Sequence, residues 1–329
     1  MVSKIIGFLK EWALIVSIVA GILAYLVYDS LTLPAIVHEY AMPSVAFMQP
    51  ALIFMMLFLT FCKVDPRHLR ICRWHLWLLL IQGGAFTLIA IVLIMLPHSP
   101  LRVVLEGAMI CLICPTATAA AVITRKLGGD VPHITTYTIL TNTLCAVLIP
   151  ALLPYVHPAP GMNALTASML IMGKVFPLLL FPLFLAMLLR KLWPALLRTL
   201  ERYPDAAFYL WVVSLALAMA VTTRSIRHSS VDFATEMWLV AVSLVSCILQ
   251  FRIGRRIGAA YNDTVACGQA LGQKNTVLAI WMGYTFFTPV TSIVGGFYSI
   301  WHNVVNSWQL HRMHKKEGLN AKAQRMLKH

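Results

Sequence analysis

The feature that most constrains this chain is a series of apolar runs of about 20 residues that recurs along its whole length. A helix of that length crosses the hydrocarbon core of a bilayer. Hydrophobic residues make up 60% of the chain and charged residues only 12%, whereas soluble domains carry roughly a quarter charged residues. The sequence therefore predicts an all-α membrane protein with almost no mass outside the bilayer.

We count ten predicted spans, and we expect residues 1–329 to form a single transmembrane domain. No small-residue cleavage site follows the first run, so we interpret it as a span rather than as a signal peptide. The ten predicted spans lie near residues 12–28, 44–62, 74–96, 103–124, 133–155, 165–189, 206–222, 233–251, 264–284 and 288–310.

The basic residues of the chain predict its orientation. The net charge is +14, but most lysines and arginines lie in one alternate set of connections and in the tail at 313–329. The other set of connections holds Arg102, Arg224 and Arg227. This is the positive-inside pattern of a multi-pass protein of the cell (inner) membrane, with both termini and the basic tail in the cytoplasm. It argues against nucleic acid as a partner, and the tail is suited to lie against anionic lipid.

The seven cysteines form no CxxC pair, and most lie within predicted spans. We therefore expect no disulfide framework and no metal site. No histidine lies near Cys114 in the sequence, and no pair of nucleophile and base is evident on facing spans, so we do not expect an enzyme.

Ten spans divide into five plus five, approximately residues 1–160 and 161–312. An odd number of spans in each half inserts the second half upside down, as in the inverted repeats of many secondary transporters. The fourth span of each half carries a helix-breaking signal: "CPTATAAA" at Cys114 to Ala121 and "ALGQKN" at Ala270 to Asn275. We expect both helices to be broken there and to cross.

Lys274 lies where a membrane span should carry almost no charge. It follows Asp263 by 11 residues, about 16 Å of helical rise, and so lies near the middle of the bilayer. Broken helices expose free N–H and C=O groups, which are tolerated only around a polar cavity. The positive ends of the half-helices there favour an anionic ligand.

Three motifs on these spans resemble those of the bile acid:sodium symporter family. "CPTATAAAVIT" is similar to its Cys-Pro-Gly-Gly-Thr-Ala-Ser-Asn-Val motif, and "ALGQKNTVLA" to its Glu-x-Gly-Met-Gln-Asn-Ser-Gly-Leu-Ala motif. "YSIWHN", from Tyr298 to Asn303, is similar to its Ser-Val/Ile-Trp-His-Asn motif. The resemblance implies a core domain of spans 3–5 and 8–10, a panel domain of spans 1, 2, 6 and 7, and import of an organic anion, usually driven by sodium.

The chain departs from this family where the family binds sodium. Gln82 falls where the family has a sodium-binding glutamine. The family's Ser-Asn pair, however, is Ala120 and Ala121 here, its Glu is Ala270, and its Gln is Lys274. A lysine and a sodium ion about 4 Å apart would repel by about 4 kcal/mol at an effective dielectric near 20. We therefore expect at least one of the usual sodium sites to be lost and no cofactor to be present.

The hypothesis that follows is that the Lys274 ammonium takes the place of a bound sodium ion. It would donate to carbonyls freed at the crossing and to oxygens such as those of Gln82, Thr116 and Thr118. Two alternatives stay open: Lys274 releases a proton during the cycle, or it stays charged in a uniporter or exchanger. The candidate substrate- and ion-binding residues are Gln82, Thr116, Thr118, Ala120, Ala121, Thr138, Ala270, Gln273, Lys274 and Asn275.

Four further polar residues are interpreted more simply. Glu106 is expected to be interfacial or, alternatively, to cap the outer end of the fourth predicted span near Arg102. Lys174 is expected to reach the outer surface. We expect His302 and Asn303 to make interhelical hydrogen bonds only.

The sequence thus predicts a secondary transporter of an organic anion, such as a bile acid or a small carboxylate. It would work by alternating access and without sodium. The alternatives are a cation–proton antiporter on a similar scaffold and a membrane receptor that binds the anion without moving it. An antiporter would want a carboxylate at the crossing, where the sequence has none.

Overall fold

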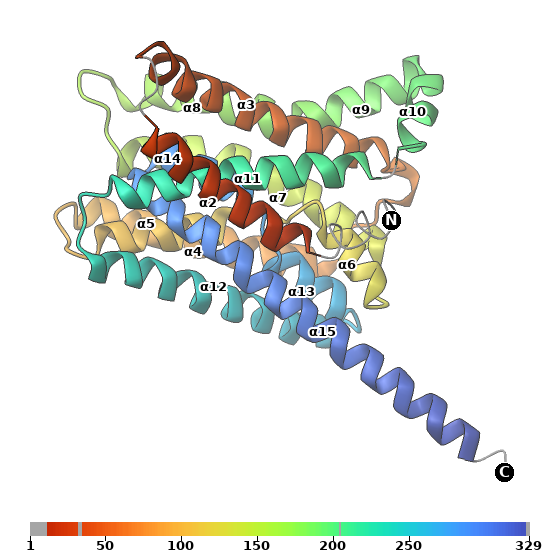
Figure 1. Cartoon of the computed structure of the whole chain (residues 1–329). Coiled ribbons are helices and arrows are strands. Elements are labelled where there is room, and N and C mark those ends of the chain that lie inside the picture. Colours follow the sequence, from red (N-terminus) through yellow and green to blue (C-terminus); the bar gives the residue numbers. More distant parts are fainter. Residues whose placement is uncertain (1–11, 32–34, 204, 327–329) are drawn as a thin grey trace.

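A computed structural model describes residues 12–31, 35–203 and 205–326, and these residues are helical almost throughout (Figure 1). The helices are α2 (Ala13–Ser30), α3 (Ala35–Cys62), α4 (Arg73–Met95), α5 (Arg102–Ile113), α6 (Ala120–Lys126), α7 (Val131–Val156), α8 (Ala164–Leu179), α9 (Phe181–Leu192), α10 (Pro194–Glu201), α11 (Ala206–Arg227), α12 (Phe233–Ala259), α13 (Thr264–Gly272), α14 (Thr276–Phe286) and α15 (Ser292–Met326). Two 3₁₀ turns, η1 (Pro66–His68) and η2 (Pro289–Thr291), join some of them.

Six helices of the described residues are long and apolar enough to cross a membrane: α2, α3 from Glu39, α4, α7, α11 and α12. A seventh is formed if α8 and α9, bent by 43° at Leu180, are one span. The other predicted spans fall on α5 with α6, on α13 with α14, and on α15. By length and composition, six or seven spans are therefore supported, while the count of ten and the inverted repeat stay predictions. Large apolar side chains such as Phe47 and Leu88 are exposed on the outside, as expected of a surface that faces lipid.

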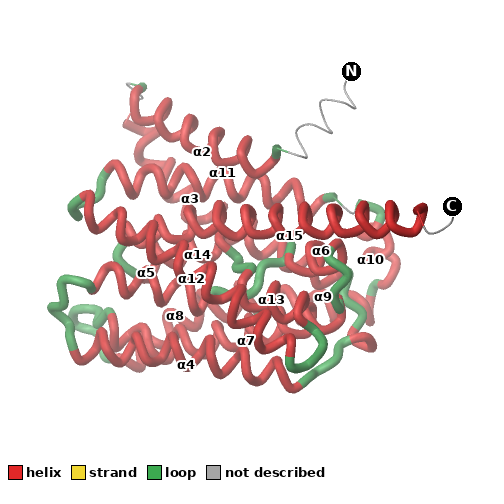
Figure 2. Tube along the Cα trace, turned by 90° about the horizontal axis from the view of Figure 1, so that it is seen from below, coloured by secondary structure: helices red, strands yellow, loops and turns green. Residues whose placement is uncertain are grey.

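The helices pack in two groups. In one, α2 packs on α11, and α3 packs on α9 and α11; in the other, α12 packs on α5, α13 and α15, and α4 packs on α5 and α7. In both views the long helices run side by side, and α15 extends past the bundle (Figures 1 and 2). We call the end that carries α6, α10 and α13 the basic end, because helices finish there in Arg125 and Lys126, in Lys191 and in Arg256.

Glycines allow α12 and α13 to pack with their backbones almost in contact. A Cβ atom on Gly254 would lie 2.5 Å from the carbonyl oxygen of Cys267, and one on Gly258 would lie 2.6 Å from that of Asp263. This small-xxx-small spacing is typical of close helix packing in membranes. Gly272, the last residue of α13, meets the ring of Phe251 on α12 in the same way.

We expect Gly272→Ala to destabilise the protein. The added Cβ would lie 2.4 Å from Cγ and Cδ1 of Phe251, and overpacking of this kind costs about 1–3 kcal/mol. The melting temperature of the purified protein should therefore fall by several degrees. Gly84→Ala is the matched control, since a Cβ at Gly84 in α4 would meet no atom within 4 Å. Equal melting temperatures for the two variants would contradict this packing.

Candidate functional site

The two predicted helix breaks are present, and they lie against each other. The chain between α5 and α6, residues 114–119, runs antiparallel to the chain between α13 and α14, residues 273–275, with Thr116 paired to Lys274. The amide of Ala117 donates to the carbonyl of Gln273 at 2.8 Å, and the amide of Asn275 donates to that of Pro115 at 2.9 Å. This confirms the prediction that both helices are interrupted and that the interruptions meet.

Pro115 explains why α5 ends where it does. A proline has no N–H and forces the residue before it into an extended conformation, and Cys114 is extended, with ψ at 130°. The last carbonyls of α5 therefore lose their helical donors and need others. Side chains from other helices supply them: Gln250 donates to Cys111 O at 3.1 Å, and Gln82 donates to Ile113 O at 2.9 Å.

Lys274 supplies the donor for the carbonyl between these two. Its Nζ donates to Leu112 O at 3.2 Å, while the amide of Thr116, the usual helical partner of that carbonyl, is bound to Thr141 Oγ1 at 3.3 Å. The Lys274 side chain is only 1% exposed. The ammonium thus points into the crossing and not into lipid, and it binds a carbonyl freed there.

Of the side-chain oxygens predicted as acceptors for Lys274, those of Gln82 and Thr116 are bonded to other groups. Gln82 accepts from the Tyr137 hydroxyl at 3.2 Å, and Thr116 Oγ1 donates to Ala270 O at 2.6 Å. The third, Thr118, lines the same cavity as Lys274. Thr138, another candidate site residue, bonds back to Ile134 O in its own helix. In the described part of the chain, the acceptor for the ammonium is a main-chain carbonyl rather than an amide or hydroxyl side chain.

The three alanines that replace polar residues of the family motifs are packed by apolar groups. Ala120 and Ala270 are fully buried in a cluster with Trp74, Tyr137 and other side chains, and Ala121 packs against that cluster. Methyl groups offer no ligand to a cation. These contacts show where the alanines pack. That the chain has lost a sodium site stays a prediction.

A small cavity of about 40 Å³ adjoins the crossing. Thr118, Gln273, Lys274 and Asn275 line it from the two breaks. Asn275 also caps α14 by accepting from the amide of Leu278 at 3.2 Å, so the positive end of this half-helix faces the cavity. A larger hollow of about 400 Å³ lies beside Asp29 and Arg227. That hollow is open and remote from the breaks, so we assign the candidate site to the smaller cavity.

Residues from three other helices, which the sequence did not assign to the site, also line this cavity: His302 and Asn303 on α15, Trp211 on α11 and Met56 on α3. The expected interhelical hydrogen bonds of His302 and Asn303 are not found. Asn303 donates to Ser299 O in its own helix, and His302 Nδ1 has no hydrogen-bond partner among the described residues. The "WHN" motif could have identified His302 and Asn303 as residues of the site. Nothing in the sequence around Met56 or Trp211 indicates that they line a cavity.

Glu106 was predicted to be interfacial or to cap the outer end of its span near Arg102. It does lie beside Arg102 in the first turns of α5, and its side chain is fully buried within the protein. Oε1 lies 3.1 Å from Arg102 Nε and 3.1 Å from His157 Nε2, and Oε2 accepts from the amide of Thr288 at 3.1 Å. The contacts of Oε1 are at ion-pair distance but without hydrogen-bond geometry. Glu106 thus joins α5, the end of α7 and the turn after α14, far from the crossing. Lys174 is exposed, with Nζ 6.0 Å from the ring centre of Phe286. That it reaches the outer surface of the membrane stays a prediction.

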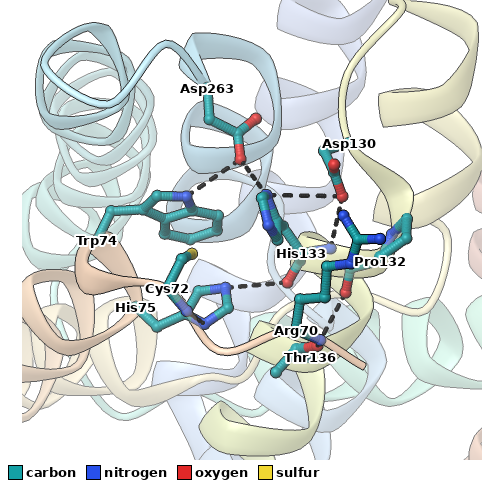
Figure 3. Close-up of polar contacts among 9 residues, drawn as sticks. All are labelled: Arg70, Cys72, Trp74, His75, Asp130, Pro132, His133, Thr136 and Asp263. Atoms are coloured by element: carbon teal, nitrogen blue, oxygen red, sulfur yellow. Dashed lines mark hydrogen bonds and ion pairs between the residues drawn. The ribbon is translucent and has the colours of Figure 1, made fainter. Parts of the chain in front are cut away.

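A second polar network holds α13 in place at the basic end (Figure 3). Asp263, just before α13, accepts from Trp74 Nε1 of α4 at 3.1 Å and lies 2.8 Å from His133 Nδ1 of α7. Asp130 caps α7 through the amide of His133 at 2.9 Å, and His75 Nε2 lies 3.1 Å from the carbonyl of His133. This network fixes the half-helix that leads to Lys274. Its members are far apart in the sequence, which gave no signal of it.

Cys72, beside this network, is the residue before α4. Burial raises the pKa of its thiol to about 11, so the thiol stays protonated near neutral pH. Among the described residues, no group of three or more His, Cys, Asp or Glu side chains is arranged to hold a metal ion.

Comparison with protein families identifies the chain. Residues 11–296 match the model of the SBF-like CPA transporter family. The chain belongs to this family. The match covers most of the chain and confirms the resemblance to bile acid:sodium symporters. Together with the apolar helices, it makes this SBF-like protein an integral multi-pass membrane protein of a transporter family. No curated protein matches the sequence.

Proposed function

We propose that this SBF-like protein is a secondary transporter of an organic anion, that it works without sodium, and that Lys274 replaces the sodium ion. The observation that carries the proposal is the position of Lys274: a buried ammonium at the meeting point of two helix breaks, beside a cavity. An intramembrane charge is costly and is functional by default. An ammonium and the positive end of α14 at one cavity suit an anion.

The arrangement of the helices supports alternating access. The cavity is lined from the two breaks and α15 on one side and from Met56 of α3 and Trp211 of α11 on the other. These are the helices expected in the core and panel domains of a ten-span inverted repeat. A volume of about 40 Å³ holds a few water molecules, whereas sites for drug-sized ligands are roughly 300–1,000 Å³. Binding a bile acid or a carboxylate would therefore require the two groups of helices to separate.

A cation–proton antiporter is less consistent with the site. Such a carrier needs a carboxylate that can bind a cation or a proton at the crossing. Glu106 is the buried acid among the described residues, and it is held by Arg102, His157 and Thr288 away from the crossing. The charge at the crossing is the positive charge of Lys274, which repels cations.

The proposal is tested by binding and by flux in the same preparation. Purified protein is heated with taurocholate, with short-chain monocarboxylates and dicarboxylates, and with aromatic carboxylates. A bound anion should raise the melting temperature, because at free concentration c it stabilises the folded protein by RT ln(1 + c/Kd). The anion that stabilises the protein most is then supplied, radiolabelled, to proteoliposomes. We expect uptake above that of protein-free vesicles. Stabilisation without uptake would indicate a receptor instead of a transporter, and neither effect with any anion would contradict the proposal.

A further inference from the structure

A stripe of polar side chains lies between α13 and α15, on the basic-end side of the crossing. On α15 its members recur every three or four residues, so they share one face of the helix. Opposite α15 lie Gln269 on α13 and Gln273, the residue that follows α13 at the break. We call this set the amide stripe; it consists of Gln269, Gln273 and, on α15, Ser299, His302, Asn306 and Gln309.

The amide stripe begins at the cavity of Lys274 and ends at the surface. Gln273 and His302 line that cavity. Gln269, Ser299 and Asn306 are almost completely buried, and Gln309 is partly exposed. From His302 to Gln309 is seven residues, about 10 Å of helical rise. The stripe therefore runs inside the protein from the cavity toward the basic end and reaches the partly exposed Gln309.

Most groups of the amide stripe lack a full set of partners. Gln269 Nε2 donates to Asn306 Oδ1 at 3.1 Å and to Gln309 Oε1 at 3.2 Å. The following atoms have no hydrogen-bond partner among the described residues: Gln269 Oε1, Gln273 Oε1, Ser299 Oγ, His302 Nδ1 and Asn306 Nδ2. Rotating an amide by 180° exchanges its oxygen and nitrogen, so a pair of amides joined by one bond still leaves one atom of each unpaired.

Unpaired polar atoms in one buried interface are expensive. Each costs about 1–3 kcal/mol, and a folded protein is stable by only about 5–15 kcal/mol in total. Water resolves this cost, because a buried water typically makes two to four hydrogen bonds to such groups. The unpaired atoms of the amide stripe include both donors and acceptors, which is what a row of hydrogen-bonded waters requires.

We propose that a file of water molecules occupies the amide stripe and connects the cavity of Lys274 with the aqueous phase at the basic end, as an access path for protons. The path rests on the proposed function, in which Lys274 is the charge at the transport site. Along such a file each water accepts one proton as it passes another to its neighbour. One proton is therefore transferred from end to end, and no other bond changes.

The experiment measures whether a small cation reaches the middle of the amide stripe. Asn306→Cys protein in proteoliposomes is treated with Ag⁺, denatured and alkylated, and the blocked fraction of the new thiol is read by mass spectrometry. We expect Ag⁺ to block this thiol at least about tenfold faster than the thiol of Ser243→Cys. Ser243 is the matched control because it is a buried polar residue on α12 outside the stripe, and its hydroxyl is bonded to Val240 O and to Trp301 Nε1. Adding Gln269→Leu should slow the blocking of the thiol in Asn306→Cys. Equal rates for the two thiols would overturn the proposal.

A second measurement does not depend on how well the variants fold. A map of the wild-type protein at a resolution that shows ordered water should contain density within hydrogen-bond distance of Ser299 Oγ, His302 Nδ1 and Asn306 Nδ2. Direct side-chain contacts there with no water would also overturn the proposal. If the protein takes up an anion but the stripe holds no water, the proposed water path is wrong and the proposed function stands. If the stripe holds water but the protein takes up no anion, the proposed function is wrong and the hydration of the stripe stands.

Discussion

Replacing Lys274 by glutamine is expected to lower anion uptake by at least about 100-fold. Glutamine keeps a donor that can reach the carbonyl of Leu112, which Lys274 Nζ contacts at 3.2 Å, but it removes the positive charge. A unit charge about 4 Å from an anion is worth about 4 kcal/mol at an effective dielectric near 20. Each 1.4 kcal/mol corresponds to a tenfold change, so most of the affinity for the anion should be lost. The measurement is initial uptake into proteoliposomes at matched protein density.

Lys174→Gln is the matched control for this loss. It removes one positive charge from the same protein, but Lys174 is exposed on α8, above the ring of Phe286, and does not line the cavity. Uptake by this variant should stay within about twofold of the wild type, because exposed charges contribute little. Sodium-free uptake at the wild-type rate by Lys274→Gln would remove the basis of the account.

The largest expected effect on stability is that of Glu106→Leu. The carboxylate is fully buried between Arg102, His157 and the amide of Thr288. Removing one partner of a buried ion pair costs about 3–5 kcal/mol. Arg102 is partly exposed, so we expect about 3 kcal/mol here. For a protein of this size the melting temperature should fall by roughly 4 °C.

Glu106→Gln separates the charge from the hydrogen bond. The amide oxygen can still accept from the backbone N–H of Thr288, whose present distance to Oε2 is 3.1 Å, while the negative charge is gone. We expect a melting temperature between those of the wild type and Glu106→Leu. If the leucine variant is as stable as the wild type, the described cluster does not hold α5 to the turn after α14.

The sequence predicted the helical breaks well because their causes are local. Pro115 has no N–H wherever it is placed, and a lysine in an apolar span must find a polar environment. The partners of these groups were not predictable, since they depend on which helices meet. Leu112 reaches Lys274 across 162 positions of the chain, and Gln250 reaches Cys111 across 139.

Side-chain burial is the feature that the sequence did not predict. Glu106 lies only a few residues from the end of its predicted span, and its position suggested an interfacial side chain or a cap near Arg102. Its burial depends on His157 and Thr288, which follow it by 51 and 182 positions. His302 belongs to the same short motif as Tyr298, but only the packing of α15 on α12 and α14 shows which face meets the cavity. The network of Asp263, His133 and Trp74 likewise requires three helices to be in place.

The central claim is that a protein-supplied positive charge at the crossing has replaced a mobile sodium ion. The most direct test is the initial rate of anion uptake into wild-type proteoliposomes as sodium is exchanged stepwise for potassium at constant ionic strength, pH and membrane potential. We predict the same rate at every sodium concentration, including zero. A rate that vanishes as sodium is removed would contradict the claim.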